Sequence, residues 1–195
     1  MSRTAEISRQ TAETQIQLTL DLDGSGEGVR QTGVGFFDHL LDAIAKHGRL
    51  DLDVRATGDL ETGPHHTVED TGLALGRALD TALGDRAGIH RFGQAAVPMD
   101  EALASCAIDV SGRPYTAFEG ELPEVRVGDF DTDLAEEFVR AVANSAKLTV
   151  HVRVDAGSNA HHMVEAAFKA FARALRQAIA PDPDESGIPS TKGLI

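Results

Sequence analysis

The sequence has very little cysteine. Cys106 is the one cysteine in 195 residues, so the chain offers no internal disulfide and no multi-cysteine metal site. This residue lies among small and apolar neighbours, from Ala104 to Ile108. We therefore expect a buried thiol that takes no part in chemistry.

Cations are also scarce in this chain. Lysine and arginine total 18 against 31 aspartate and glutamate residues, which gives a formal net charge of −13 at pH 7. Such a surface repels the phosphates of nucleic acids and of anionic membranes, so neither is an expected partner. An anionic substrate would need a local basic pocket.

Long hydrophobic runs are absent as well. No apolar stretch approaches the length that crosses a membrane, and residues 1–14 are polar, without the hydrophobic region of a signal peptide. We therefore expect a cytoplasmic protein. A hydrophobic content of 42% in 195 residues is enough for one good core.

An internal repeat organises the chain. The segments 36–79 and 135–175 each read as helix, strand, loop and helix. In the first helices Leu40 matches Phe138 at an offset of 98 (138 − 40). In the second helices Val68 matches Val164 at an offset of 96 (164 − 68), because the first copy has two extra loop residues. Both copies carry apolar stripes at helical spacing, which predicts two similar core-facing helix pairs.

Alternating strand patterns precede each copy of the repeat, at 14–22 in the first half and at 94–97 and 103–110 in the second. The predicted fold class is α+β, with two similar βαβα-type halves intertwined in one compact domain. The domain would cover residues 1–195, with halves at approximately 1–90 and 91–195.

Two matching motifs, HHTVE and HHMVE, stand where a loop enters the second helix of each copy. Each glutamate follows the first histidine by four residues and the second by three, so either imidazole can share a helical face with it. Imidazole and carboxylate ligands suit manganese, iron, zinc or nickel, and the lack of thiolates weakens a structural zinc site. The motif residues are His65, His66, Glu69, His161, His162 and Glu165.

The duplication of this motif decides between two interpretations. A single histidine pair at a helix start is usually a solvated or hydrogen-bonded helix end. Two pairs at equivalent positions favour metal binding, because core packing has no need for imidazoles and an acid. His39 also lies at the equivalent of Glu137 (137 − 39 = 98), so each half offers a further ligand from its first helix. Two pseudo-equivalent metal sites are therefore predicted.

Spacing alone leaves the division of the ligands open. One division uses the three-apart pairs, His66 with Glu69 and His162 with Glu165, each joined by the first histidine of the opposite motif. The other uses the four-apart pairs, each joined by the second histidine of the opposite motif. Both separations place a pair on one helical face.

The motifs, taken in order along the chain, carry a specific resemblance. They are FFDHLLDAIAKH, HHTVED, RFG, VPMDEAL, SGRP, HHMVEAAFKAFARALRQ and IPSTKG. From near residue 9 to the end, the chain resembles the imidazoleglycerol-phosphate dehydratases of histidine biosynthesis. The resemblance implies a cytoplasmic hydro-lyase that converts D-erythro-imidazoleglycerol phosphate to imidazoleacetol phosphate. It also implies two Mn²⁺ ions per active site and a large homo-oligomer, a 24-mer, with its sites between subunits.

The resemblance further implies which residues bind and transform the substrate. Glu13 matches the family's N-terminal catalytic glutamate and is the candidate acid or base. Plausible neighbours are His47, Asp70, Asp100 and Glu101, for which capping or surface roles are equally good interpretations. Coordination of the substrate ring to manganese should favour an imidazolate, because the metal acts as a Lewis acid. The resemblance also assigns residues that bind the substrate, chiefly its phosphate. They are Arg91, Arg113, Lys169, Ser190 and Lys192.

One position departs from the family's pattern. Glu137 stands where the family commonly has a histidine, in EEF instead of EHF. A carboxylate oxygen suits manganese, so Glu137 could coordinate it or leave the position to water. His151 is a weaker replacement, because it lies in an alternating strand. The resemblance favours the three-apart division, with His39 completing the first set and Glu137 the second.

Two other functions fit the same ligands. A non-catalytic metal-binding assembly protein would use them without needing Glu13, Arg91, Arg113 or Lys192. A dinuclear metallohydrolase would need an open metal position with a bound hydroxide. The ordered motifs outside the metal helices favour the dehydratase.

Overall fold

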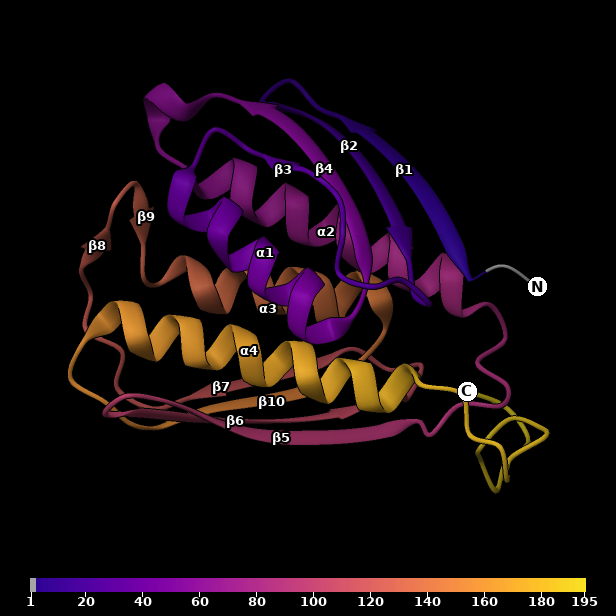
Figure 1. Cartoon of the computed structure of the whole chain (residues 1–195). Helices are drawn as coiled ribbons and strands as arrows, with labels where there is room; N and C mark the ends of the chain where they lie inside the picture. Colours follow the sequence, from indigo (N-terminus) through magenta and orange to yellow (C-terminus); the bar gives the residue numbers. More distant parts are fainter. Residues whose placement is uncertain (1–2) are drawn as a thin grey trace.

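Two four-stranded sheets enclose four long helices in the computed structural model, which describes residues 3–195 (Figure 1). In spatial order, the first sheet consists of β1 (Thr4–Gln10), β2 (Thr14–Asp21), β4 (Asp51–Gly58) and β3 (Arg30–Gln31). The second sheet consists of β5 (Phe92–Met99), β6 (Ala102–Asp109), β10 (Thr149–Ala156) and β7 (Tyr115–Glu119).

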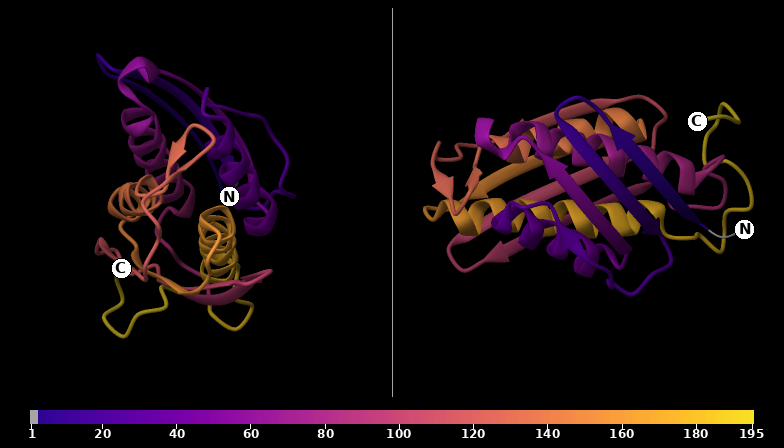
Figure 2. Two further views of the ribbon diagram at one scale, coloured as in Figure 1. Left: turned by 90° about the vertical axis from the view of Figure 1, so that its left-hand side faces the viewer. Right: turned by 90° about the horizontal axis from the view of Figure 1, so that it is seen from above.

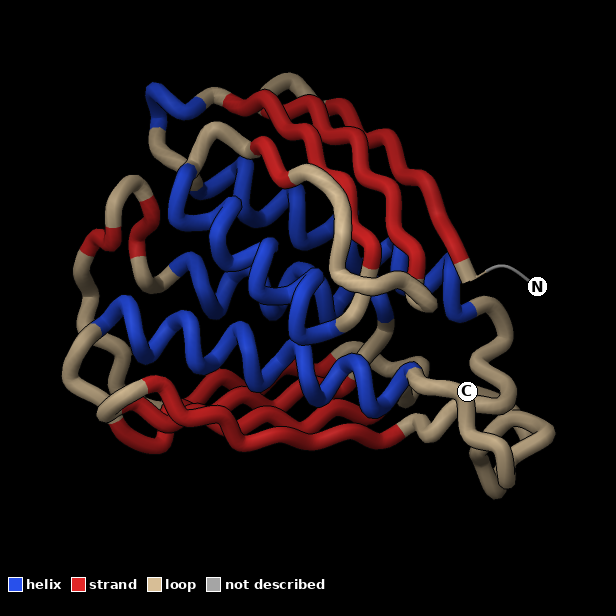
Figure 3. Tube along the Cα trace, in the orientation of Figure 1, coloured by secondary structure: helices blue, strands red, loops and turns tan. Residues whose placement is uncertain are grey.

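The helices lie between the two sheets, as the end-on view in Figure 2 shows. They are α1 (Gly35–Gly48), α2 (His65–Leu83), α3 (Leu134–Ala146) and α4 (Ala160–Ile179). A short 3-10 turn (Leu60–Thr62) precedes α2, and a small hairpin of β8 (Arg126–Val127) and β9 (Phe130–Asp131) precedes α3. The helix α2 packs under β1 and β2, and α4 packs on β5 and β6 (Figure 3).

The helices pair across the repeat. The first helix, α1, packs against α4, and α2 packs against α3, so each helix pair takes one member from each half of the chain. This exchange makes the two halves one intertwined unit. It also means that any site between paired helices draws its side chains from both halves.

The strands repeat the same pattern in both halves. In the first sheet β2 pairs antiparallel with β1 and β4, and β3 pairs parallel with β4. In the second sheet β6 pairs antiparallel with β5 and β10, and β7 pairs parallel with β10. The predicted α+β class with duplicated halves is therefore confirmed, and the boundary predicted near residue 90 falls between α2 and β5.

Three strands of the two four-stranded sheets lie outside the predicted pattern, β1, β3 and β7, as does the small hairpin of β8 and β9. The strand β1 is an edge strand that pairs only with β2. Its inward side carries Ala5, Ile7 and Arg9, of which only Ala5 is fully buried. Such a strand needs little hydrophobic sequence, because one face meets solvent. The polar composition of β1 is therefore the reason that the sequence did not predict this strand.

The apolar stripes of the repeat form the core. The matched positions of the repeat are all buried. In the first helices they are Leu40, Leu41 and Ile44 with Phe138, Val139 and Val142, and in the second helices Val68, Gly72, Leu75, Leu79 and Leu83 with Val164, Phe168, Phe171, Leu175 and Ile179. Close contact between α2 and α3 depends on Gly72, because a Cβ there would lie 2.8 Å from the Cβ of Ala141. Cys106 is also buried, and burial raises the pKa of its thiol to about 12. The thiol is therefore buried, as predicted, and is protonated at neutral pH. Among residues 3–195, no helix combines the length and the apolar composition of a bilayer span.

Candidate metal centre

Two histidines and a glutamate meet where α1 packs against α4. His39 Nε2 lies 3.3 Å from Glu165 Oε2, and His161 Nε2 lies 3.1 Å from the same oxygen. One ligand atom from each of the three lies within 4.8 Å of the others. The glutamate is buried, whereas the two imidazoles are open to solvent on one side. Two nitrogens and one carboxylate oxygen at this separation could hold a transition-metal ion.

The start of α4 is held in place by two caps. Asn159 Oδ1 accepts a hydrogen bond from the backbone N–H of His161 at 3.0 Å. Glu101, in the turn between β5 and β6, accepts from the backbone N–H groups of Ser158 and Asn159 at 3.1 and 2.8 Å. A polar N-cap and a carboxylate both stabilise the positive end of a helix. The HHMVE motif is therefore fixed in the first turn.

The charge on Glu165 is set by its neighbours. Burial raises the pKa of this carboxyl group, but hydrogen bonds from Lys169 and His39 lower the pKa more, and the net result lies below the ordinary value. Lys169 Nζ lies 2.7 Å from Glu165 Oε1. His47, in the last turn of α1, has its pKa lowered by burial and then by the positive charges of Lys169 and Arg173. The carboxylate is therefore ionised, and His47 is neutral at pH 7.

The second histidine of each motif is tied to a carboxylate through Nδ1. His66 Nδ1 lies 3.0 Å from Asp59 Oδ2, and His162 Nδ1 lies 2.8 Å from Glu101 Oε2. These hydrogen bonds are the main reason that the pKa of each imidazole is raised. A carboxylate on one ring nitrogen orients the other nitrogen toward a metal, which is the usual arrangement around metal-binding histidines.

The equivalent seam between α2 and α3 is arranged differently. His65 Nε2 lies 3.8 Å from Glu69 Oε2, and both side chains are exposed. Glu137, on α3, accepts a hydrogen bond at 2.6 Å from Arg140, which also pairs with Glu136. Within residues 3–195, the candidate metal ligands whose ligand atoms lie close together are those at α1 and α4. This group includes no residue of the HHTVE motif. It contains a four-apart pair, His161 with Glu165.

The turn between β1 and β2 brings Glu13 to the start of α2. Glu13 Oε1 lies 3.8 Å from His66 Nε2, on the side of the ring opposite to Asp59. Its side chain is 53% exposed. Glu13 therefore adjoins a predicted metal ligand while its carboxylate remains accessible.

The predicted phosphate-binding cations divide into two places. Lys169 lies with Glu165 on α4, near the histidines. Arg91 binds Asp109 through two nitrogens and donates to the carbonyl of Pro189 at 2.8 Å, which ties the C-terminal tail to the second sheet. Arg113 and Lys192 are exposed, and Ser190 Oγ accepts from the backbone N–H of Lys192 at 3.2 Å. The tail lies at the far end of α4 from His161 (Figure 1).

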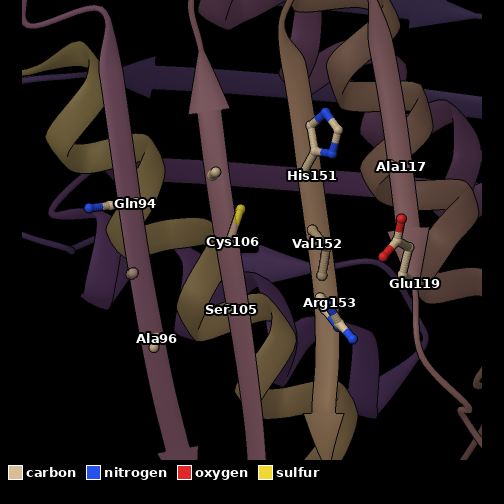
Figure 4. Close-up of a pocket in the computed structure, with 11 residues that line it drawn as sticks. Gln94, Ala96, Ser105, Cys106, Ala117, Glu119, His151, Val152 and Arg153 are labelled. Atoms are coloured by element: carbon tan, nitrogen blue, oxygen red, sulfur yellow. The ribbon is translucent and has the colours of Figure 1, made fainter.

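The outer face of the second sheet carries a shallow hollow of about 600 Å³, lined mainly by β5, β6, β7 and β10 (Figure 4). His151 lies there, with its ring centroid 5.5 Å from that of Tyr115 on β7. The hollow contains Ala96, Ala107 and Ala117 but none of the predicted metal ligands. His151 is therefore not a substitute for a histidine at position 137 within this chain.

The comparisons with known proteins bear directly on this site. A family model described as imidazoleglycerol-phosphate dehydratase matches residues 32–175. The chain belongs to the imidazoleglycerol-phosphate dehydratase family. The imidazoleglycerol-phosphate dehydratase of Moorella thermoacetica is 58% identical over 195 residues, with 100% of both chains covered. That of Methanoculleus marisnigri is 56% identical over 193 residues, covering 99% of this chain and 100% of its own.

Solved structures of this dehydratase family share the fold. The enzyme of Staphylococcus aureus has a TM-score of 0.83 at 39% identity, covering 91% of this chain and 99% of its own. That of Pyrococcus furiosus, in complex with (S)-C348, has a TM-score of 0.84 at 36% identity, covering 97% and 100%. The resemblance seen in the motifs is confirmed, and membership of this family supports dehydratase activity, that of a hydro-lyase.

The contact of Asp59 with His66 in the candidate site was not predicted from the sequence. Asp59 and Glu101 play the same part toward His66 and His162, yet they stand at non-equivalent positions, 7 and 61 residues before their histidines. The repeat therefore gave no signal for Asp59. For Glu101, the sequence left capping and chemistry equally open, and the structure shows a cap that also binds an imidazole.

Proposed function

We propose that the protein dehydrates D-erythro-imidazoleglycerol phosphate to imidazoleacetol phosphate in histidine biosynthesis, in the cytoplasm, with two Mn²⁺ ions per active site. The group of His39, His161 and Glu165 carries this proposal, because it places metal ligands on the fold of a dehydratase family. Metal dependence is general in this family.

The donor chemistry fits manganese. Imidazole nitrogens and carboxylate oxygens are ligands that Mn²⁺ accepts, and thiolates are absent from both motifs. A bound ion would supply Lewis-acid stabilisation of negative charge on the imidazole ring of the substrate. The residues that we assign to the two ions are His39, His65, His66, Glu69, Glu137, His161, His162 and Glu165.

The reaction removes a carbon-bound proton and the hydroxyl of the adjacent carbon, which leave together as water. Glu13 is the group that we assign to this proton, because its accessible carboxylate stands 3.8 Å from His66 Nε2. His47 is neutral and so could accept a proton near Lys169. Lys169 would contact the substrate phosphate while keeping Glu165 ionised.

The length of α4 supports the proposal that sites are shared between subunits. The helix runs from Ala160 to Ile179, which is about 30 Å at 1.5 Å per residue. The HHMVE motif stands at its first turn, whereas Arg91 lies beside its last turn, where its backbone N–H donates to the carbonyl of Ala178 at 2.9 Å, and the tail lies beyond that turn (Figure 1). One small substrate cannot span that distance. We therefore propose a large homo-oligomer, the 24-mer of the resemblance, in which a neighbouring copy supplies the tail cations to each metal centre.

The direct test is an assay of metal-free protein supplemented with Mn²⁺. We expect imidazoleacetol phosphate to form from imidazoleglycerol phosphate, activity to disappear on chelation, and Mn²⁺ to restore it. Protein that binds metal but yields no product would favour the assembly protein. Release of inorganic phosphate instead of water would favour the metallohydrolase.

Lys192→Ala should mainly weaken substrate binding. A charge-assisted contact to a phosphate is worth about 1.5–3 kcal/mol, so KM should rise about 10- to 100-fold while kcat changes little. Steady-state kinetics would measure both. Lys46→Ala removes another exposed lysine and is the matched control. Unchanged kinetics in Lys192→Ala would exclude the tail as a phosphate clamp.

Mn²⁺ affinity should fall as the pH is lowered. The pKa values of His66 and His162 are raised from 6.5, chiefly by Asp59 and Glu101. Raised values mean that these imidazoles stay protonated to higher pH, and a protonated imidazole cannot bind metal. For each imidazole that must lose a proton to bind the metal, Mn²⁺ affinity should fall about tenfold per pH unit below the pKa of that imidazole. Titration with Mn²⁺ at pH 8 and pH 6 would show this loss, and equal affinities would contradict the assignment of these histidines.

A further inference from the structure

The side chain of Asp70 binds residues on both sides of the turn between β1 and β2. It lies on α2, one residue after Glu69, and is 7% exposed. Its Oδ1 accepts from Arg9 Nε and Nη2 at 2.9 and 2.6 Å, and its Oδ2 accepts from Thr14 Oγ1 at 2.5 Å. Arg9 is near the end of β1, and Thr14 begins β2. One buried carboxylate therefore joins both strands at the point where they turn.

The turn itself is closed by hydrogen bonds around Thr11. Its hydroxyl accepts from the backbone N–H groups of Glu13 and Thr14 at 3.1 and 2.9 Å, and its own N–H donates to the carbonyl of Thr14 at 2.9 Å. The carbonyl of Glu13 accepts from the N–H of Asp59 at 3.1 Å. The backbone of Glu13 is therefore fixed, while its carboxylate lies 3.8 Å from His66 as its one ion pair within residues 3–195.

The second half of the repeat lacks this anchor. Ala166 stands at the position equivalent to Asp70 (166 − 70 = 96), and the turn between β5 and β6 is held by its own carboxylate. Glu101 binds the start of α4 through Oε1 and His162 through Oε2. Both of its oxygens are thereby occupied. In the first half Asp70, on α2, anchors the turn, so the carboxylate of Glu13 is not needed to hold the turn and keeps only its 3.8 Å approach to His66 within residues 3–195.

We propose that Asp70 is a positioning residue for Glu13. Through Thr14 and Arg9 it fixes the turn so that Glu13 faces the substrate without being used as a structural ligand. This inference rests on the proposed function, since it needs Glu13 to act on the substrate. It assigns Asp70 no contact with substrate or metal.

A matched pair of variants at Thr14 tests the link. Thr14→Val keeps the shape of the side chain but removes the hydroxyl that donates to Asp70, whereas Thr14→Ser keeps that hydroxyl. Small misplacements of a catalytic group can cost about 10²-fold. We expect Thr14→Val to lower kcat about 10- to 100-fold with KM and Mn²⁺ content close to those of the parent. Thr14→Ser should restore most of kcat. Equal kcat in the two variants would overturn the proposal.

A double-mutant cycle separates positioning from general stability. Asp70→Asn should lower kcat in the parent protein but have no further effect in the Glu13→Gln background, because the group that it positions is already lost. An additive loss in the double variant would show that Asp70 acts through something other than Glu13. An inactive parent protein would instead defeat the proposed function, so the two failures are distinguishable. Metal content and melting temperature, measured on every variant, exclude loss of the neighbouring Glu69 ligand or of the fold.

Discussion

Replacing Glu13 with glutamine should lower kcat by about 10²- to 10⁴-fold, the range typical of general acid–base catalysis. The amide has the size of the carboxylate but can neither accept nor release the proton of the reaction. The side chain is exposed and lies in a turn fixed by its backbone, so the fold and the Mn²⁺ content should stay intact. Steady-state turnover, with metal analysis of the same preparation, would measure the effect.

Glu6→Gln provides the control for this experiment. Glu6 is an exposed carboxylate on the same edge strand, β1, so its neutralisation makes the same change in net charge at a place that we assign no chemistry. It should leave turnover unchanged. Near-normal turnover in Glu13→Gln would remove Glu13 from the mechanism, and loss of one Mn²⁺ ion would make it a metal ligand instead.

The repeat made the fold predictable because helix stripes depend on local spacing. Leu40 and Phe138, or Val68 and Val164, keep their places in both copies and are buried as expected. Each stripe needs only the 3.6-residue period and apolar side chains. The strand β1 was not predicted, because an edge strand that pairs with β2 needs neither a helical period nor a run of apolar side chains.

The pairing of helices across the halves was beyond a sequence argument. Spacing shows which face of a helix is apolar but not which other helix covers that face. The contact of α1 with α4 brings His39 to Glu165 and so creates the metal-ligand group. The contact of Asp59 with His66 could not be predicted either, because Asp59 lies in a connection between β4 and α2 whose path no sequence periodicity describes.

The two seams also differ in a way that the repeat concealed. At the first, His39 faces Glu165 across the helices. At the second, Glu137 is paired with Arg140, so a metal would have to compete with a guanidinium for that carboxylate. The charge-assisted bond must be broken or shared before Glu137 can bind an ion. The second site should therefore be the weaker one in this chain.

The three-apart division places Glu165 and Glu137 on one ion, but the group at α1 and α4 joins His39 to the four-apart pair of His161 and Glu165. We therefore assign Glu137 to the other ion, and variants of Glu165 and Glu137 should separate the two metal sites. The parent protein should retain about two Mn²⁺ ions per chain after mild dialysis. Outer-shell partners alone are worth about 10- to 100-fold in metal affinity, so removing a ligand should cost at least about 100-fold. Glu165→Ala should therefore lose one ion and the activity, because it deletes the only carboxylate of the group at α1 and α4.

Glu137→Ala should weaken the other ion, and Glu137→His should retain or strengthen it, because an imidazole restores the ligand common in the family and no longer pairs with Arg140. Glu136→Ala is the matched control, since Glu136 precedes Glu137 on α3 and shares the same arginine. It should leave two ions per chain. Elemental analysis and Mn²⁺ titration of all three variants would decide the matter. If Glu137→Ala kept full occupancy at both sites, its carboxylate would be no ligand, only the surface partner of Arg140.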